Sequence, residues 1–97
     1  MLVALERFDL RIPGCGSLKE KRHVVKTLTA GLRSKFNVSV AEVDHHDLWQ
    51  RTTLAVAATG AEQYHVKKVM HEVEKFVERW TEVEVIDARL TLHYPDD

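Results

Sequence analysis

The stretch LVALERFDLRIPGCGSLKEKR, residues 2–22, contains the pattern that decides the fold. Apolar and polar residues alternate over Leu2–Ile12, a period of two that only Glu6 interrupts, and this predicts a strand that ends at the following proline. Ser17 and Glu20 then form a capping box, in which each side chain satisfies a free backbone donor of a first helical turn. The stretch therefore predicts a strand and then a helix, joined by a turn that contains two glycines.

The rest of the chain predicts a hairpin, a second helix and a last strand. The first helix is expected to run to about Lys35, and two β-rich runs, 37–43 and 52–59, predict a hairpin. Thr59 and Glu62 match a second capping box, ahead of a helix with helical apolar spacing as far as Trp80, and alternation over 83–94 predicts a last strand.

The predicted order is βαββαβ, which favours a ferredoxin-like α+β fold with a four-stranded antiparallel sheet and two helices on one face. Residues 1–97 are expected to form a single domain of this kind. In this topology the first helix begins at the same end of the sheet as the tip of the hairpin. Segments 13–22 and 44–51 should therefore face each other.

Composition excludes several classes of protein. A single cysteine, Cys15, rules out an internal disulfide and a multi-cysteine metal site. The first apolar run stops at Glu6, too short for a signal peptide or a membrane span, so we expect a cytoplasmic protein with no membrane contact. Net charge is −1, but residues 1–59 carry nine Lys/Arg against six Asp/Glu. The positive charge is local, unlike that of an overall basic nucleic-acid binder.

This local charge lies on the predicted first helix. On a wheel of about 100° per residue, Lys19, Arg22, Lys26 and Arg33 fall within an arc of about 60°. Together with the free N–H groups of the helix start, such a ridge suits the phosphates of RNA or another anion. A solvated helix face is the alternative reading. The predicted anion- or RNA-binding set is Ser17, Lys19, Lys21, Arg22, Lys26 and Arg33.

Lys21 differs from the others because it falls near the centre of the apolar stripe. A lysine there must reach solvent along its aliphatic stem or find a carboxylate. Glu42, Asp44 or Asp47 could supply that carboxylate from the facing hairpin. Lys21 is thus predicted to clamp helix to hairpin, with direct ligand contact as the alternative.

The hairpin tip offers two further predictions. Asp44-His45-His46-Asp47 has the residue types of a metal-dependent hydrolase, but three convergent ligands are required and polar turn residues are the simpler reading. Trp49, Gln50 and Arg51 are predicted to contact RNA or a partner, although Trp49 could instead cover the end of the core. No catalytic residue is assigned. No cofactor is assigned either, because Gly14 and Gly16 match neither nucleotide-binding glycine motif.

The open face of the predicted sheet argues against one familiar mode of RNA binding. An RNA-recognition motif stacks bases on aromatic residues of its first and third strands, and these positions hold no aromatic residue here. Small and apolar residues such as Val3, Leu5, Ala41, Ala55 and Ala57 stand there instead. A flat face of this kind suits a homodimer.

Several of these segments also carry a resemblance to a known family. The runs SLKEKR (17–22), FNVSVAEV (36–43) and DLWQR (47–51), with Ile12-Pro13 ahead of them, resemble the YlxP-like family of small bacterial proteins of unknown function. The resemblance implies a ferredoxin-like fold and no defined catalytic residues. The family's setting beside transcription-elongation, translation-initiation and ribosome-maturation factors implies a role with RNA or the ribosome.

Overall fold

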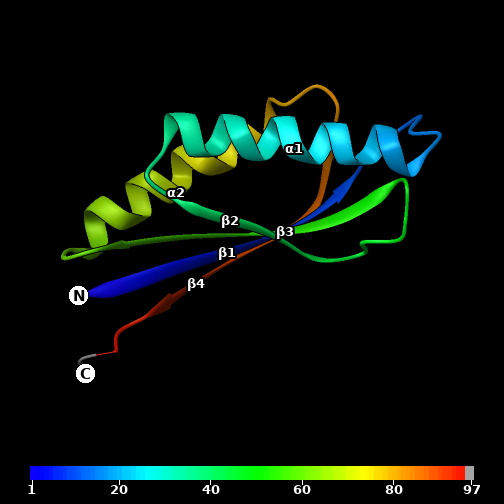
Figure 1. Ribbon diagram of the computed structural model, residues 1–97. Helices are drawn as coiled ribbons and strands as arrows, with labels where there is room; N and C mark the ends of the chain where they lie inside the picture. The colour runs from blue at the N-terminus through cyan, green and yellow to red at the C-terminus, as the bar shows by residue number, and fades with distance from the viewer. Residues whose placement is uncertain (96–97) are drawn as a thin grey trace.

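The computed structural model describes residues 1–95 and confirms the predicted order of elements. The elements are β1 (Leu2–Arg11), α1 (Leu18–Lys35), β2 (Ser39–Asp44), β3 (Arg51–Gly60), α2 (Gln63–Glu78) and β4 (Glu84–His93). Figure 1 shows both helices above one face of the sheet. Asp96 and Asp97, part of the predicted single domain, lie outside the described residues.

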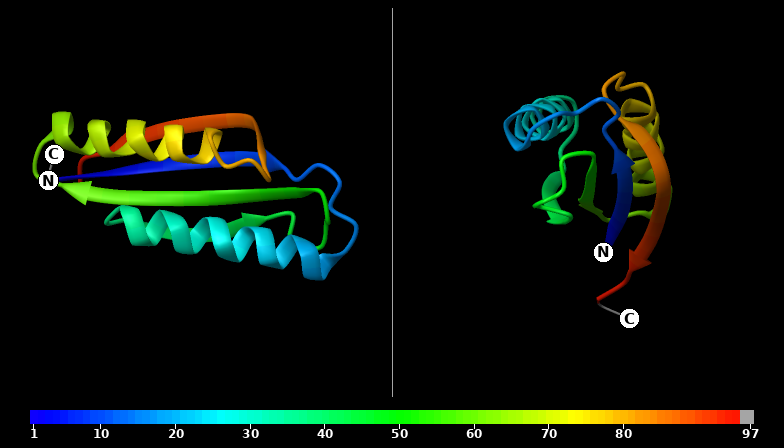
Figure 2. Two further views of the ribbon diagram at one scale, coloured as in Figure 1. Left: turned by 90° about the horizontal axis from the view of Figure 1, so that it is seen from above. Right: turned by 90° about the vertical axis from the view of Figure 1, so that its right-hand side faces the viewer.

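The four strands form one antiparallel sheet in the order β2-β3-β1-β4, which is the ferredoxin-like arrangement. The two long central strands, β1 and β3, pair over ten residues from Leu2↔Gly60 to Arg11↔Arg51. β2 and β4 are the edges, and each has a register irregularity. In the left view of Figure 2 the helices lie side by side along the sheet, α1 on the side of β2 and α2 on the side of β4.

The core lies between the sheet and the helices, where the alternating side chains of β1 and β3 meet the apolar faces of α1 and α2. Phe8, Leu54, Leu28 and Met70 are each at most 1% exposed and represent the four elements. In the part of the chain that the structure describes, no helix or strand covers the opposite face of the sheet, as the right view of Figure 2 shows. No helix within residues 1–95 has the length and apolar character needed to cross a membrane.

The second predicted capping box is wrong. Thr59 belongs to β3, and its hydroxyl donates to the Leu2 carbonyl oxygen at 2.9 Å. α2 begins at Gln63 after Glu62, whose side chain makes no capping hydrogen bond within the described range 1–95. Pairing of β3 with β1 therefore outweighs the local helix-start signal of Thr59 and Glu62.

The two segments that were expected to face each other do meet at one end of the sheet. The Ile12 N–H donates to the Gln50 carbonyl oxygen at 2.9 Å, and the Gln50 side-chain amide donates to the Cys15 carbonyl oxygen at 3.2 Å. These bonds join the β1–α1 connection to the hairpin tip. Figure 1 shows both loops at the right-hand end of the molecule.

Candidate nucleic-acid interface

Ser17 caps the start of α1 as the sequence predicts, whereas the Glu20 carboxylate binds a backbone donor that precedes the cap residue. The Ser17 hydroxyl oxygen accepts from the Glu20 N–H at 3.1 Å, and the Glu20 carboxylate accepts from the Gly16 N–H at 2.8 Å. Glu20 thus brings a negative charge to the positive end of the helix dipole. The Glu20 carboxylate therefore occupies the helix start, where the sequence predicts an external anion.

Lys21 is clamped to the hairpin, which confirms the prediction, and the carboxylate it finds is Glu42. The Lys21 side chain is 1% exposed, and its Nζ lies 2.9 Å from Glu42 Oε2. Nζ also donates to the carbonyl oxygen of His45, and Glu42 Oε2 accepts from the Thr52 hydroxyl at 2.6 Å. Because its ammonium is buried and paired, Lys21 serves to lock α1 onto β2.

The surroundings of Glu42 favour its charged form. Burial alone would raise the pKa of this carboxyl, but hydrogen bonds from Thr52 and Lys21 and the positive charge of Lys21 outweigh burial. The pKa of Glu42 is therefore lowered. At neutral pH the clamp is an ion pair in which both partners are also hydrogen-bonded.

A left-handed residue turns the backbone toward this clamp. His45 has φ of +62°, and its carbonyl oxygen receives the Lys21 ammonium as well as the Leu48 N–H at 3.2 Å. The preceding carboxylate, Asp44, accepts from the His45 N–H at 2.7 Å, and this bond lowers the pKa of Asp44. Non-glycine residues seldom adopt this conformation, and histidine is among those that do so most readily.

A groove of about 600 Å³ lies between α1 and β2. Arg22, Lys26 and Arg33 line its helix side, and Val40 and Ala41 line its strand side. Arg33 Nη2 donates to the Val40 carbonyl oxygen at 2.7 Å, which fixes this guanidinium against the strand. We call this feature the α1–β2 groove. Four of the predicted anion-binding residues line it, these three and the buried Lys21.

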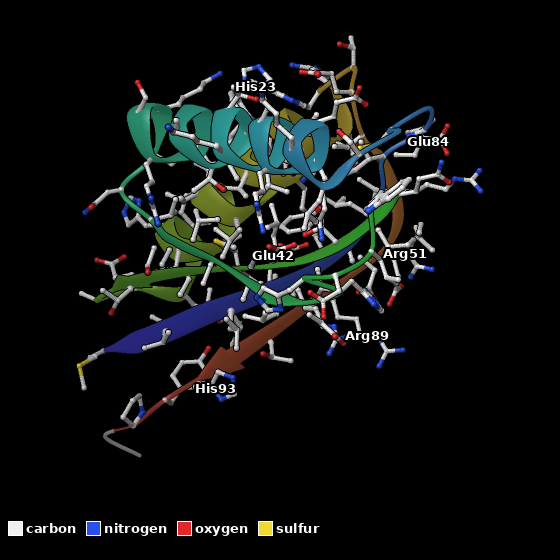
Figure 3. All side chains as sticks on the ribbon, turned by 45° about the vertical axis from the view of Figure 1, so that its right-hand side comes forward. His23, Glu42, Arg51, Glu84, Arg89 and His93 are labelled. Carbon is white, nitrogen blue, oxygen red and sulfur yellow. The ribbon has the colours of Figure 1, made fainter. Side chains whose placement is uncertain are left out.

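Lys19 is separated from these three cations. It lines a second hollow, of about 480 Å³, together with Cys15, His23 and Glu82. In Figure 3 His23 extends from α1 away from the sheet. The wheel placed Lys19 on the same ridge as Arg22, but in the fold the ridge divides at the first turn of α1 between two hollows.

The three predicted contact residues of the hairpin have different surroundings. Trp49 is 51% exposed and lines a shallow hollow that shares Asp47 with the α1–β2 groove. Gln50 uses its side-chain amide to hold the Cys15 carbonyl, and Arg51 is half-buried at the start of β3. Of the three, Trp49 thus exposes a large aromatic ring at the hairpin tip, while Gln50 binds the β1–α1 connection.

The histidines and aspartates of the tip do not converge. His46 Nε2 lies 3.2 Å from the Glu42 carbonyl oxygen, while His45 Nδ1 lies 4.0 Å from Asp44 Oδ1. Within residues 1–95, no three or more His, Cys, Asp or Glu side chains are grouped as a metal site would need. The metal-dependent hydrolase stays a prediction without a ligand set.

Comparison with known proteins places the chain in a family. A family model described as "Protein of unknown function (DUF503)" matches residues 3–90. The chain belongs to the DUF503 family. It is also 39% identical, over 83 residues, to the "Uncharacterized protein YlxP" of Bacillus subtilis (strain 168), a match that covers 86% of this chain and 90% of that protein. The predicted resemblance to YlxP-like proteins is confirmed.

Solved structures that resemble this DUF503 chain support the fold alone. The de novo designed protein Foldit4 has a TM-score of 0.55 and 12% sequence identity, covering 94% of this chain and 97% of that one. The cofactor-independent oxygenase SnoaB from Streptomyces nogalater has a TM-score of 0.49 and 9% identity, covering 99% and 93%. The likeness to the designed protein agrees with the ferredoxin-like topology, and the likeness to SnoaB carries no argument.

One buried acidic residue of this DUF503 chain interrupts the sequence pattern, but no role is predicted for it from the sequence. Glu6, the break in the β1 alternation, is 1% exposed, and its Oε1 has no hydrogen-bond partner among residues 1–95. Burial raises the pKa of Glu6 to about 8, helped by a hydrogen bond with Glu74 and by the negative charges of Glu74 and Glu78. A polar residue at a core position was the available signal.

Proposed function

We propose that this DUF503 protein is a non-catalytic module that binds single-stranded RNA along the α1–β2 groove, with Trp49 as a stacking surface at one end. The observation that carries the proposal is the alignment of Arg22, Lys26 and Arg33 along one wall of the groove. Single-stranded RNA is held by this combination of a positive track for phosphates and an exposed aromatic ring for a base.

The dimensions of the groove fit a short segment of RNA. Arg22 and Arg33 are eleven residues apart on α1, which is about 16 Å along the helix axis at about 1.5 Å per residue. The groove continues through Asp47 to the hollow beside Trp49. Domains that bind single strands in this way cover about 4–16 nucleotides. The length and charge of this surface support a site at the lower end of that range.

Binding is favoured over catalysis because the reactive groups near the groove are engaged in structural bonds. Glu42 is held by Lys21 and Thr52, and its lowered pKa makes it a weak base at neutral pH. Cys15 is 5% exposed and donates its S–H to the Ser17 carbonyl oxygen at 3.3 Å. The resemblance to YlxP-like proteins implies a setting beside translation and ribosome-maturation factors. We therefore propose ribosomal RNA as the first class of RNA to test.

The proposal is tested by fluorescence anisotropy with a labelled single-stranded RNA of about twelve nucleotides, a length within the range that such sites cover. Arg22→Glu combined with Lys26→Glu reverses two groove charges, and we expect it to weaken binding at least about tenfold. The plot of log K against log salt should also become shallower by about 1.4, because each single-strand phosphate contact contributes about 0.7.

The matched control reverses two charges on the other helix. Lys67→Glu combined with Lys68→Glu changes the net charge equally, at two exposed positions of α2 that do not line the groove. It should leave the salt slope unchanged. If both double variants weaken binding equally, the attraction is a property of net charge and the groove is not the site. Sedimentation with ribosomes at low and high salt then distinguishes ribosomal RNA from a protein partner.

A further inference from the structure

The two edge strands of the sheet differ in how many side chains bind their backbone. On β2, the Val40 carbonyl oxygen accepts from Arg33, and the Glu42 carbonyl oxygen lies 3.2 Å from the ring of His46. The backbone of β4 receives no hydrogen bond from any side chain of residues 2–95. Side chains therefore occupy one edge strand, while the other is left open.

β4 is a long edge for a small domain. It runs for ten residues, Glu84–His93, and most of its side chains are exposed, including Ile86 at 51%. A register shift opposite Asp9 and Leu10 leaves Ile86 without a partner on β1. Long exposed edge strands present unpaired backbone groups and readily add another strand. Figure 3 shows Arg89 and His93 on this outer strand, on the side of the sheet away from the helices.

The charges on β4 are unfavourably placed within one copy of the chain. Arg89 lies directly opposite Arg7, and Asp87 lies directly opposite Asp9. Like charges that face each other across two strands destabilise the pair. Ion pairs along each strand relieve this in part, with Arg7 Nε 3.7 Å from Asp9 Oδ1 and Arg89 Nε 3.1 Å from Asp87 Oδ2. Each like-charge pair starts a row of side chains that runs across the sheet. A strand added on the other side of β4 would extend both rows and can supply the opposite charges.

We propose that the β4 edge binds a second copy of this chain, β4 against β4, in an antiparallel register centred on Ala88. In this register Asp87 of each copy lies opposite Arg89 of the other. Both rows then carry two positive and two negative charges across the joined sheets. The result is a continuous eight-stranded sheet with two-fold symmetry, which leaves the α1–β2 groove open at each far edge.

The charge pattern selects this register from its neighbours. Because side chains alternate between faces, the nearest registers that keep each side chain on its face are centred on Asp87 or on Arg89. The first places Asp87 opposite Asp87, and the second places Arg89 opposite Arg89. On the other face, the register centred on Ala88 brings the exposed Ile86 opposite the half-buried Leu90 of the second copy.

Charge reversal tests both the surface and the register, using sedimentation equilibrium on the full chain at about 10–300 μM, because an edge-to-edge contact is narrow and weak. Asp87→Arg alone and Arg89→Asp alone each place like charges opposite each other in a homodimer. We expect each to weaken dimerisation about tenfold. An equal mixture of the two variants restores both unlike pairs, so the heterodimer should form as well as the unmodified dimer.

The control separates the β4 edge from the opposite edge of the sheet. Val43→Lys places a charge on β2, at the opposite edge, where Val43 is 50% exposed. It should leave dimerisation unchanged, and circular dichroism should show all variants folded. The proposal is overturned if the unmodified chain is monomeric at every concentration or if the mixture does not recover the dimer. It is also overturned if Val43→Lys dissociates the dimer while the β4 variants do not.

Discussion

Lys21 Nζ lies 2.9 Å from Glu42 Oε2, and the lysine side chain is 1% exposed. This ion pair joins the first turn of α1 to β2 and so closes one end of the α1–β2 groove. The same ammonium donates to the backbone of His45 at the hairpin tip. One buried cation therefore holds three parts of the proposed interface in place: the helix with the basic residues, the edge strand, and the loop that leads to Trp49.

Removing this cation should destabilise the fold. Lys21→Met leaves Glu42 without its ionic partner, and we expect the free energy of unfolding to fall by about 2–4 kcal/mol, since breaking a buried pair leaves an uncompensated charge. Lys21→Met combined with Glu42→Leu should cost less than the sum of the two single changes. Urea denaturation measures both. Lys19→Met, at an exposed position two residues away, should shift stability by no more than about 0.5 kcal/mol.

Glu6 should make stability fall as the solution becomes more alkaline. The pKa of this carboxyl is about 8 in the folded chain and 4.5 in the unfolded one, so the folded chain holds the proton between these values. The free energy of unfolding therefore decreases from about pH 4.5 to about pH 8, at about 1.4 kcal/mol per pKa unit as an upper bound. Glu6→Gln should remove this decrease.

Denaturation of the two proteins across this pH range provides the measurement. A slope that persists unchanged in Glu6→Gln would assign the effect to another group. Glu74→Gln removes one of the negative charges that raise the pKa of Glu6, and should shift the end of the decrease to lower pH. Glu42 acts in a different window: its lowered pKa makes its contribution present above pH 4.5 and lost on acidification below it.

Gly60 should resist the addition of a single methyl group. A Cβ at this position would lie 2.7 Å from Val66 Cγ2, the side chain that begins the buried stripe of α2. Gly60→Ala should lower the free energy of unfolding by about 1–3 kcal/mol, because the branched valine has little freedom to move. At Gly16 the added Cβ would meet Glu20 Oε2 at an ordinary 3.7 Å. Gly16→Ala is therefore the control, and thermal unfolding measures both variants. An equal loss of stability in the two would contradict the packing argument.

Trp49 should affect RNA binding without affecting stability. The side chain is 51% exposed, so Trp49→Ala should change the free energy of unfolding by no more than about 0.5 kcal/mol. If the ring stacks on a base, the same change should weaken RNA binding by about 1–3 kcal/mol, and Trp49→Phe should retain most of the affinity. Equal affinity of the alanine and unmodified proteins would remove Trp49 from the interface.

The sequence predicts most of this architecture because its strongest signals are local and mutually consistent. The alternation of β1, the Ser17–Glu20 capping box and the apolar stripe of α2 each occur where the structure has them. Lys21, placed in an apolar stripe, predicted a clamp. The choice of Glu42 over Asp44 and Asp47 could not be predicted, because it depends on the register irregularity of β2 and on the left-handed backbone of His45.

Other details depend on contacts between distant elements. Lys19 lies beside Arg22 on an isolated helix, but packing of α1 between the hairpin and the Glu82 loop puts these two side chains at different hollows. Thr59 carries a helix-start signal, but its hydroxyl bonds to Leu2 of the neighbouring strand. The like-charge rows on β1 and β4 require the strand register, which alternation alone does not specify.

The most direct test of the proposed RNA interface is an amide chemical-shift titration of the ¹⁵N-labelled protein with the same short single-stranded RNA. We predict that the largest shifts occur at Arg22, Lys26, Arg33 and Ala41 and at the indole N–H of Trp49, while α2 and β4 change little. Shifts centred on α2 or β4, or no shifts at RNA concentrations that saturate binding, would contradict the assignment of RNA binding to the α1–β2 groove.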